Sequence, residues 1–304
     1  MGEVFRCSKR LKYMSPITIG RGYTEKYIFN PHRDQLRESI EKAFKNLTKN
    51  KQAIIVEGTG HAGVGSVIDF SNADVASLLG SKVIIISEGG IGKSLDEIML
   101  NKALFDLKHV EILGVIINKV LPEKYEKIKV TLGRGLENKD IRLLGVIPVD
   151  PILSFPTTEQ MKERLGLELL CGDIKSPYRV EHTIVAAMEP HNMINYLKRG
   201  TLVITSGDRV DNILVAVSSH LVNETGHQIA GIILTGGLMP NPKIVDLLKK
   251  SRIPVFISSH DTYTVAGQVE HLICKIQKTD KDKIKEATDL VKKYVDVDAI
   301  LANC

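Results

Sequence analysis

Three short apolar runs in the second half of the chain each end in residues that could bind an anion. TLVITSGDR, at 201–209, ends in a Gly flanked by a hydroxyl, an acid and a base, and GIILTGG and PVFISSHDTYT follow the same plan. An Arg can grip a phosphate or carboxylate through two parallel hydrogen bonds, and glycine amides can add donors. The residue types therefore predict a site for a small anionic ligand. Its candidate residues are Asp208, Arg209, Thr235, Gly236, Gly237, Asp261, Thr262 and Tyr263.

Several of these residues could serve a purely structural role instead of binding a ligand. Asp208 could orient Arg209 on the ligand, or it could cap the following helix while Arg209 pairs with it. The glycines could serve only to turn the chain. Tyr263 could stack on a nucleotide base, or it could pack with its hydroxyl satisfied. The sequence favours the cap for Asp208, without excluding a ligand role beside it, and packing for Tyr263.

A second candidate site lies in the first half of the chain, around Glu57. The run AIIV at 53–56 predicts a buried strand, and a carboxylate at the end of such a strand can hold a magnesium ion beside phosphates. The glycines that follow, including Gly58 and Gly60, predict a sharp bend or a close approach of a ligand to the backbone. The alternative for Glu57 is a local cap.

The stretch SEGGIGKS, at 87–94, follows a predicted strand and ends in Gly-Lys-Ser before a helical pattern, as a phosphate loop does. The full motif needs Gly in place of Ser87. Amides around Gly90 could still bind an anion at the helix start, with Lys93 adding charge, or Lys93 could simply be solvated. Asp69 and Asp74 are further candidate oxygen ligands, but the position of Asp74 favours capping of the helix DVASLL. The candidate cofactor site, for Mg and ATP with Glu57 as metal ligand, comprises Glu57, Gly58, Gly60, Gly90 and Lys93.

The elements that must position these residues alternate between strand and helix. Runs at 83–86, 112–117 and 143–149 predict strands, and residues 34–47 predict an amphipathic helix packed on a sheet, whereas 1–28 has no period and is expected to connect. Short runs that are apolar on both faces are typical of parallel strands in an α/β sheet. Because parallel strands deliver their carboxyl ends to one edge, the polar tips of the second half should share one rim.

Length and composition indicate an ordinary globular protein. The 304 residues favour two domains, which we expect at 1–170 and 171–304. The 41 basic and 36 acidic residues are spread along the chain, so nucleic-acid binding is not indicated. The four Cys are isolated, which argues against disulfides and fits a reducing cytoplasm. No apolar run reaches the roughly 18 residues of a membrane span, so we expect no membrane association.

Longer stretches carry a family resemblance. The first half contains AIIVEGTGHAGVGSVIDFSNADVASLLGSKVIIISEGGIGKSLDEI, then GVIINKV and LLGVIPVDPILSFPTTEQM. It resembles the dethiobiotin-synthetase-like nucleotide-binding domain at the amino end of long bacterial phosphotransacetylases. The second half, with GDR, TGG and DTYT in order, resembles the DRTGG domain that follows it there. The resemblance implies a truncated P-loop NTPase-like parallel sheet followed by a smaller α/β DRTGG domain.

One departure from the family pattern limits the expected activity. In dethiobiotin-synthetase-like domains the phosphate loop lies on the first strand, ahead of the region that matches 14–28, and these 304 residues contain no GxxxxGK[ST]. Without those amides and that lysine, phosphoryl transfer loses its main electrostatic support. We therefore expect no autonomous enzyme. The resemblance also implies that the phosphotransacetylase catalytic domain would follow the DRTGG region, and it is absent from this sequence.

The sequence thus favours a regulatory, ligand-sensing or assembly protein. Its DRTGG half would bind a small anionic metabolite or nucleotide, or form a homo-oligomer. The alternative is an ATP-dependent ligase or synthase, resembling dethiobiotin or cobyrinic acid amide synthetase, that needs a phosphate-loop segment from elsewhere. A third possibility is a structural subunit whose rim is an interaction surface without a small ligand.

Overall fold

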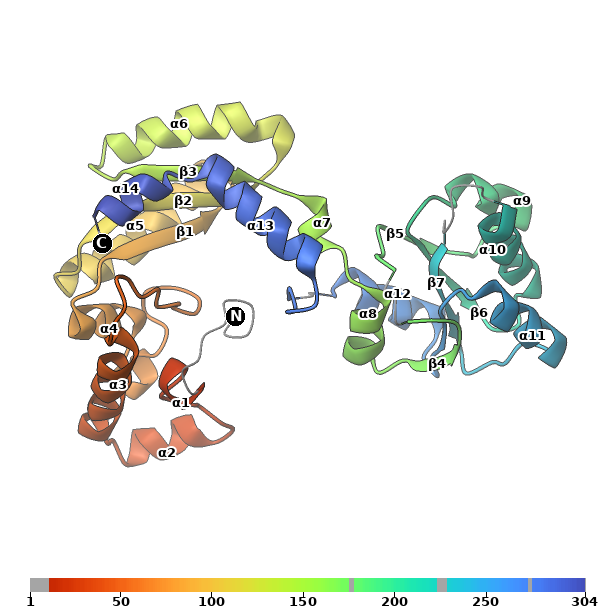
Figure 1. Ribbon diagram of the computed structural model, residues 1–304, viewed down its shortest axis with the longest axis horizontal. Helices are drawn as coiled ribbons and strands as arrows, with labels where there is room; N and C mark the ends of the chain where they lie inside the picture. The colour runs from red at the N-terminus through yellow and green to blue at the C-terminus, as the bar shows by residue number, and fades with distance from the viewer. Residues whose placement is uncertain (1–10, 175–177, 223–228, 273–274, 304) are drawn as a thin grey trace. The chain divides into compact units, whose positions relative to one another are not determined.

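The computed structural model describes residues 11–174, 178–222, 229–272 and 275–303, and the statements below concern these residues. They form two compact units, one running to Asp150 and including the residues from Gln277, the other comprising 151–276 (Figure 1). The expected boundary after residue 170 therefore falls inside the second unit. The reason is that strand β4 (Glu168–Cys171) pairs with a strand of that unit, whereas the last helices pack on the first.

The described part of the first unit contains a three-stranded parallel sheet in the order β1-β2-β3. Its strands are β1 (Val83–Glu88), β2 (Ile112–Val120) and β3 (Leu143–Pro148). Each strand begins at the first residue of a run that the sequence predicts to be a strand. The apolar residues on both faces of these strands explain the parallel pairing, because helices cover the sheet on both sides.

Helices α4 (Asn72–Leu79), α5 (Gly92–Leu107) and α6 (Tyr125–Glu137) cover one face of this sheet, where Ile85, Val115 and Ile117 pack with apolar residues of all three. The other face carries Ile116 and Leu144. They pack against Val295 and helix α14 (Val297–Ala302), which follow α13 (Lys281–Tyr294). The first unit is therefore a three-layer α/β/α structure, with α6 seen beside β3 in Figure 1.

The predicted strand at 53–56 does not form. These residues are irregular, and the side chains of Ile55 and Val56 are 97% and 50% exposed. The composition is that of a buried strand, but a strand needs a hydrogen-bonded neighbour, and no described residue pairs with this segment. Glu57 consequently does not stand at the end of a strand.

The amino-terminal part of the first unit is helical. Helices α1 (Leu11–Met14) and α2 (Tyr23–Phe29) lie in the region expected only to connect, whose first ten residues are outside the described part. Helix α3 (Arg33–Thr48) contains the predicted helix at 34–47. It does not pack on the sheet as expected. Its apolar stripe joins a separate cluster that contains Tyr27, Leu36, Ile40, Ile68 and Phe70.

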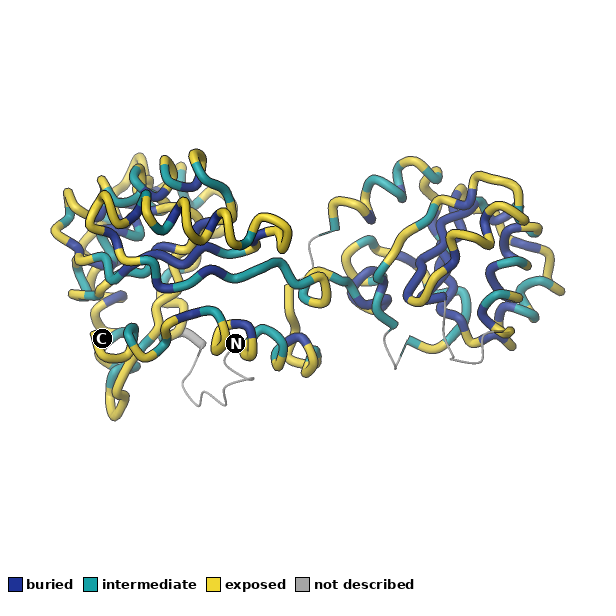
Figure 2. Tube along the Cα trace, turned by 90° about the horizontal axis from the view of Figure 1, so that it is seen from above, coloured by how far each residue is buried: buried dark blue, intermediate teal, exposed yellow. Residues whose placement is uncertain are grey.

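The second unit is built on a mixed five-stranded sheet in the order β4-β8-β7-β6-β5, as far as the structure describes it. The parallel strands are β5 (His182–Val185), β6 (Thr201–Ser206), β7 (Ile229–Thr235) and β8 (Val255–Ile257), while β4 is antiparallel to β8. Every residue of β7 and all but the last of β6 are buried, and Figure 2 shows this buried centre. The predicted parallel arrangement of the three runs is thus confirmed in β6, β7 and β8, while β5 extends it and β4 runs antiparallel.

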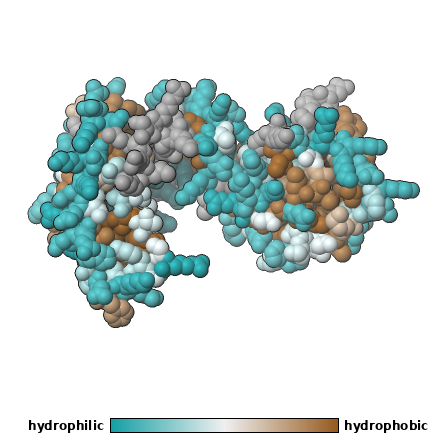
Figure 3. All heavy atoms as spheres, turned by 60° about the horizontal axis from the view of Figure 1, so that its bottom comes forward, coloured by the Kyte–Doolittle hydropathy of each residue, from teal (hydrophilic) through white to brown (hydrophobic). Residues whose placement is uncertain are grey.

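The connections explain the layering of the second unit. Strands β5 to β8 are added in sequence in one direction, so right-handed crossovers place the intervening helices on the same face. That face is covered by α9 (Pro190–Met193), α10 (Val210–Val222) and α11 (Pro242–Ser251). Helices α8 (Thr158–Leu165) and α12 (Thr262–Glu270) cover the other. The surfaces of both units mix hydrophilic side chains with smaller apolar patches (Figure 3).

The cap of helix α4 is Ser71, and Asp74, which the sequence predicts to cap the helix DVASLL, is its reciprocal partner at the third helical position. Ser71 Oγ accepts from the Asp74 amide, and Asp74 Oδ2 accepts from the Ser71 amide, both at 3.0 Å. Lys108 Nζ lies 2.7 Å from Asp74 Oδ1. Burial alone would raise the pKa of the Asp74 carboxyl, but the hydrogen bonds from Lys108 and Ser71 outweigh it and hold the pKa below its ordinary value.

This lowered pKa predicts an acid-dependent loss of stability. The stabilisation is fully present above the unfolded pKa of about 3.9 and is lost as the pH falls through the lower folded pKa. Asp74→Asn should reduce the free energy of unfolding by about 1–2 kcal/mol near neutral pH. Thermal unfolding followed from about pH 6 to about pH 2.5 should show the gap to the wild type closing. Asp298→Asn, at an exposed aspartate without an ion pair among the described residues, should leave no such gap.

Candidate functional site

The carboxyl ends of β6, β7 and β8 meet at one edge of the second sheet. Ser206 lies opposite Thr235, and Leu234 lies opposite Ile257. The amide of Gly236 donates to the carbonyl of His260 at 2.8 Å, which ties the loop after β7 to the loop after β8. The polar tips of the three predicted strands therefore share one rim, as parallel pairing requires. We call the residues 206–209, 235–237 and 258–263 the rim.

Gly236 and Gly237 of the rim turn the chain and do not present amide donors. Gly236 and Gly237 have φ values of 77° and 65°, in the left-handed region that favours glycine. Their amides donate to the carbonyls of His260 and Ser258, each at 2.8 Å. The expectation that these amides bind an anion is therefore wrong in this structure, because neighbouring loops already use them.

Thr235 and Thr262 hold the rim together from within. Thr235 is 1% exposed, and its hydroxyl lies 2.7 Å from the hydroxyl of Thr262 and 3.3 Å from the carbonyl of Thr205. These contacts join β7 to β6 and to the first turn of α12. The Thr235 hydroxyl thus stabilises the rim from inside the protein.

Arg209 is oriented by Asp211 and not by Asp208. Its Nε and one terminal nitrogen donate to the two Asp211 oxygens at 3.0 and 2.9 Å, and the same terminal nitrogen lies 3.4 Å from the Met188 carbonyl. This bidentate bond raises the pKa of Arg209 and lowers that of the Asp211 carboxyl. The Asp208 side chain is exposed and makes no hydrogen bond with a described residue, so neither its pairing with Arg209 nor its capping role is found. The sequence signal that we missed is the acid in the first turn of α10.

The loop after β8 contains one structural acid and one exposed aromatic ring. Asp261 caps α12, since its carboxylate accepts from the Thr264 amide at 3.0 Å and from the Thr264 hydroxyl at 2.6 Å. Those two bonds lower the pKa of Asp261. Tyr263 is 88% exposed, which makes the packing interpretation wrong. Its ring is available to a ligand or to a partner.

A cavity of about 370 Å³ opens beside the rim. Its lining joins rim residues to the end of α8 and the start of β4, and consists of Leu165, Gly166, Glu168, Gly237, Ile257, Ser258, Ser259 and His260. Glu168 and Gly166 could not be found by following the strand ends in the sequence. They reach this edge because β4 runs antiparallel to β8 and so begins where β8 ends.

In the first unit, the glycine-rich loop after Glu57 is held by Asn72. The Asn72 amide group donates to the carbonyls of Thr59 and His61 at 2.9 and 2.8 Å. A Cβ at Gly58 would lie 3.0 Å from the Asn72 side chain, and Gly60 has a φ of 68°. The loop thus bends sharply, as predicted. Glu57 itself is exposed and makes no hydrogen bond or ion pair with a described residue.

The turn before α5 is closed by Ser94, whose hydroxyl donates to the Glu88 carbonyl at 2.7 Å. A Cβ at Gly90 would lie 2.7 Å from that hydroxyl, so a side chain there would displace the hydroxyl from its hydrogen bond. The Lys93 side chain is 86% exposed and lies 3.6 Å from Glu97, which matches the solvated alternative. Helix α5 has no side-chain cap and no acid in its first turn, so its first amides remain a possible anion site.

Oxygen ligands do not gather around Glu57 in the part of the chain that is described. No group of three or more His, Cys, Asp or Glu side chains lies close enough to hold a metal ion within these residues. The role of Glu57 toward magnesium therefore stays a prediction. Cys171 is a free thiol whose pKa is raised by burial, and the other three cysteines lie outside the described residues.

Comparison with known families divides the chain close to the boundary between the two units. The model of an AAA domain matches residues 2–157, and that of a DRTGG domain matches residues 160–272. The phosphate acetyltransferase of Pseudomonas putida is 29% identical over 95% of this chain and 43% of its own length. That of Nitratidesulfovibrio vulgaris is 29% identical over 88% of this chain and 39% of its own. This chain thus spans about two fifths of the curated relatives that it matches.

Among solved structures, the comparison finds the CBS and DRTGG domains of the regulatory region of Clostridium perfringens pyrophosphatase, complexed with the activator diadenosine tetraphosphate. The TM-score is 0.32 at 16% identity, over 68% of this chain and 86% of that one. Separately, none of the helices in the described residues combines the length and apolar composition that a bilayer span requires.

The close approach of the rim loops predicts that one added methyl group at Gly207 destabilises the second unit. A Cβ at Gly207 would lie 1.7 Å from the carbonyl oxygen of Leu238, so the loops after β6 and β7 would have to separate. Gly207→Ala should lower the free energy of unfolding of the second unit by about 2 kcal/mol or more in urea titrations. Gly267→Ala is the matched control, because nothing lies within 4 Å of that position in α12, and it should stabilise by about 0.5–1 kcal/mol. Equal effects of the two substitutions would contradict the described rim.

Proposed function

Because this chain belongs to the AAA domain family through residues 2–157 and continues into a DRTGG domain at 160–272, we propose that it is a regulatory or assembly protein. Its DRTGG domain would bind a small anionic metabolite or a nucleotide at the rim. The relatives that it matches are named phosphate acetyltransferase, and the match covers their amino-terminal region. Within such a protein, these domains would regulate or assemble a catalytic part that lies elsewhere.

The observation that carries this proposal is that the exposed Tyr263 and the half-buried Arg209 follow strands that end at the same edge of the sheet. Tyr263 follows β8, and Arg209 follows β6, with β7 between them. Neighbouring strands are about 4.8 Å apart, so the two strand ends are separated by about 10 Å. This is the scale of a nucleotide from its base to its phosphates. The Tyr263 ring would stack on the base while Arg209 faces a phosphate.

Arg209 keeps donors for such a ligand. Asp211 occupies its Nε and one terminal nitrogen, but the guanidinium has five N–H donors in all. The bidentate bond also fixes the plane of the guanidinium, which lowers the entropy lost when an anion binds. Asp211 therefore serves as a positioning residue in this proposal, and Asp261 keeps the first turn of α12 in place for Tyr263.

Self-association through the same domain is the assembly part of the proposal. Leu238 and Met239 follow the glycine pair of the rim and are 44% and 55% exposed. Adjacent exposed apolar side chains at a loop tip favour burial against another surface. A second copy of the chain would supply that surface and form a homo-oligomer.

An ATP-dependent ligase or synthase is the second candidate. It is supported by the AAA domain match and by the uncapped start of α5, where Lys93 is the second residue. This function would need a phosphate loop from a segment outside the sequence described here. Magnesium-dependent ATP hydrolysis that Glu57→Gln abolishes would favour it over a regulatory role.

The ligand proposal predicts a thermal shift that depends on the rim. ATP, acetyl phosphate and diadenosine tetraphosphate serve as probes of the full chain. A probe at about 100 times its Kd should stabilise the folded state by about 2.7 kcal/mol and raise its Tm. Tyr263→Ala and Arg209→Gln should each remove most of that shift, since each removes one of the two recognition groups.

The controls are Tyr196→Ala and Arg199→Gln, which change exposed residues of the same unit before the amino end of β6 and outside the rim. Both should leave the shift unchanged. Sedimentation of the same variants reports on assembly. If no probe shifts the wild type, and Arg209→Gln or Tyr263→Ala only disrupts self-association, the rim is an assembly surface and the ligand proposal is wrong.

A further inference from the structure

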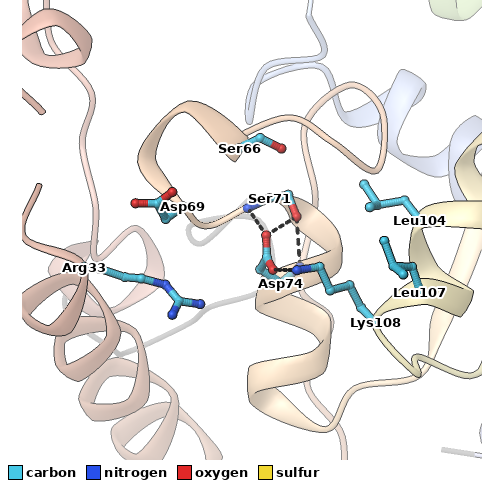
Figure 4. Close-up of a pocket in the computed structure, with 8 residues that line it drawn as sticks. All are labelled: Arg33, Ser66, Asp69, Ser71, Asp74, Leu104, Leu107 and Lys108. Carbon is cyan, nitrogen blue, oxygen red and sulfur yellow. Dashed lines mark hydrogen bonds and ion pairs between the residues drawn. The ribbon is translucent and has the colours of Figure 1, made fainter. Parts of the chain in front are cut away.

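We infer that the first unit holds a separate binding site for a small carboxylate or phosphate, with Arg33 as its main recognition group. A cavity of about 550 Å³ opens between the starts of α3 and α4 and the end of α5 (Figure 4). Cavities of this size are typical of small-molecule sites. The lining residues are Arg33, Ser66, Asp69, Ser71, Asp74, Leu104, Leu107 and Lys108.

Arg33 is the cation in this cavity that no described carboxylate neutralises. Its guanidinium points into the cavity in Figure 4 and lies 5.5 Å from the centre of the Phe70 ring. It makes no hydrogen bond or ion pair with a described residue, so its five donors are free for a ligand. The ring contact limits where the guanidinium can lie without consuming those donors.

The position of Arg33 in its helix is a second reason to expect an anion. It is the first residue of α3, a helix of 16 residues whose preceding residue provides no side-chain cap. A cation at a helix amino end is unfavourable, because that end carries the positive pole of the helix dipole. Asp34 in the first turn offsets part of this repulsion, and an anion bound beside Arg33 would offset more of it and would also face the first amides of the helix.

On the opposite wall of the cavity, the charges of Asp74 and Lys108 neutralise each other, and hydrogen bonds hold the Asp74 carboxylate in place. Asp74 is occupied by Lys108 at 2.7 Å and by Ser71, whose hydroxyl and amide both donate to it. The Lys108 ammonium group has three N–H donors and donates one of them to Asp74. A second cation with donors to spare therefore lines the same cavity, while the carboxylate next to it does not repel an anion as a free charge would.

Asp69 suggests that the ligand also carries a hydrogen-bond donor. Its Oδ2 accepts from the buried hydroxyl of Tyr27 at 2.9 Å, and burial together with this bond raises the pKa of Tyr27 to about 12. The second Asp69 oxygen makes no hydrogen bond with a described residue. A hydroxyl or ammonium group on the ligand would satisfy it. Leu104 and Leu107, the latter 70% exposed, provide an apolar wall for a short carbon chain.

The position of this cavity in the fold separates it from the candidate cofactor loops. Helix α5 begins after the carboxyl end of β1 and ends before the amino end of β2, so Leu107 and Lys108 lie toward the amino edge of the sheet. Active sites of parallel sheets gather at the carboxyl edge. The cavity is therefore suited to an effector and not to a substrate. It lies in the first unit and does not depend on the ligand proposed for the rim.

Calorimetric titration of the full chain with inorganic phosphate, lactate and alanine tests this inference. Phosphate offers the anion alone, lactate adds a hydroxyl and a methyl group, and alanine adds an ammonium group. We expect saturable binding of at least one probe with a Kd below about 10 mM. Stronger binding of lactate or alanine than of phosphate identifies the carboxylate class and a contact with Asp69. The reverse order identifies the phosphate class.

Variants localise the binding. Arg33→Gln should raise the Kd at least tenfold, and Arg33→Lys should raise it less, because the charge is kept while the bidentate geometry is lost. Arg37→Gln is the matched control one turn later on α3, where the side chain is exposed and paired with Glu41 at 2.9 Å, and it should change the Kd by less than about twofold. Unchanged Tm values without probe show that the variants fold. Absence of saturable binding by all three probes, or equal affinity of Arg33→Gln and the wild type, overturns the inference.

Discussion

Parallel pairing of β6, β7 and β8 is the constraint on which the second unit depends. Hydrogen-bonded register leaves no freedom in where these strands end, so Ser206, Thr235 and Ile257 must arrive at the same edge. Burial of both faces makes any slip costly, because it would move apolar residues out of two cores at once. The loops that follow are then close enough to bond to one another, as Gly236 does with His260.

That closeness changes what the polar residues of the rim do. Thr235, Asp261 and the two glycine amides are largely occupied in holding the loops together. Such internal bonds make the rim rigid, and rigidity favours ligand binding because less entropy is lost. The groups left for recognition are few and exposed, chiefly the Tyr263 ring and the remaining donors of Arg209.

The first unit differs from the second in how its candidate sites are formed. Its sheet is well packed, but the apolar segment 53–56 has no strand partner among the described residues. The loops that looked most like phosphate sites are shaped by neutral contacts, from Asn72 in one case and Ser94 in the other. Around the cavity between α3, α4 and α5, Asp74 and Lys108 form an ion pair, while Arg33 has no ion pair with a described residue.

The sequence by itself determined the α/β class, strands β1 to β3 and β6 to β8, and the part that Asp74 takes in a helix cap, because each depends on local pattern and on neighbours a few residues away. It also predicted that the strand tips share a rim. Tertiary structure alone decided that β4 runs antiparallel and brings Glu168 to the rim, and that 53–56 stays exposed. These outcomes depend on which groups, distant in sequence, lie close enough in space to pair. The order of residues along the chain does not show which of them will do so.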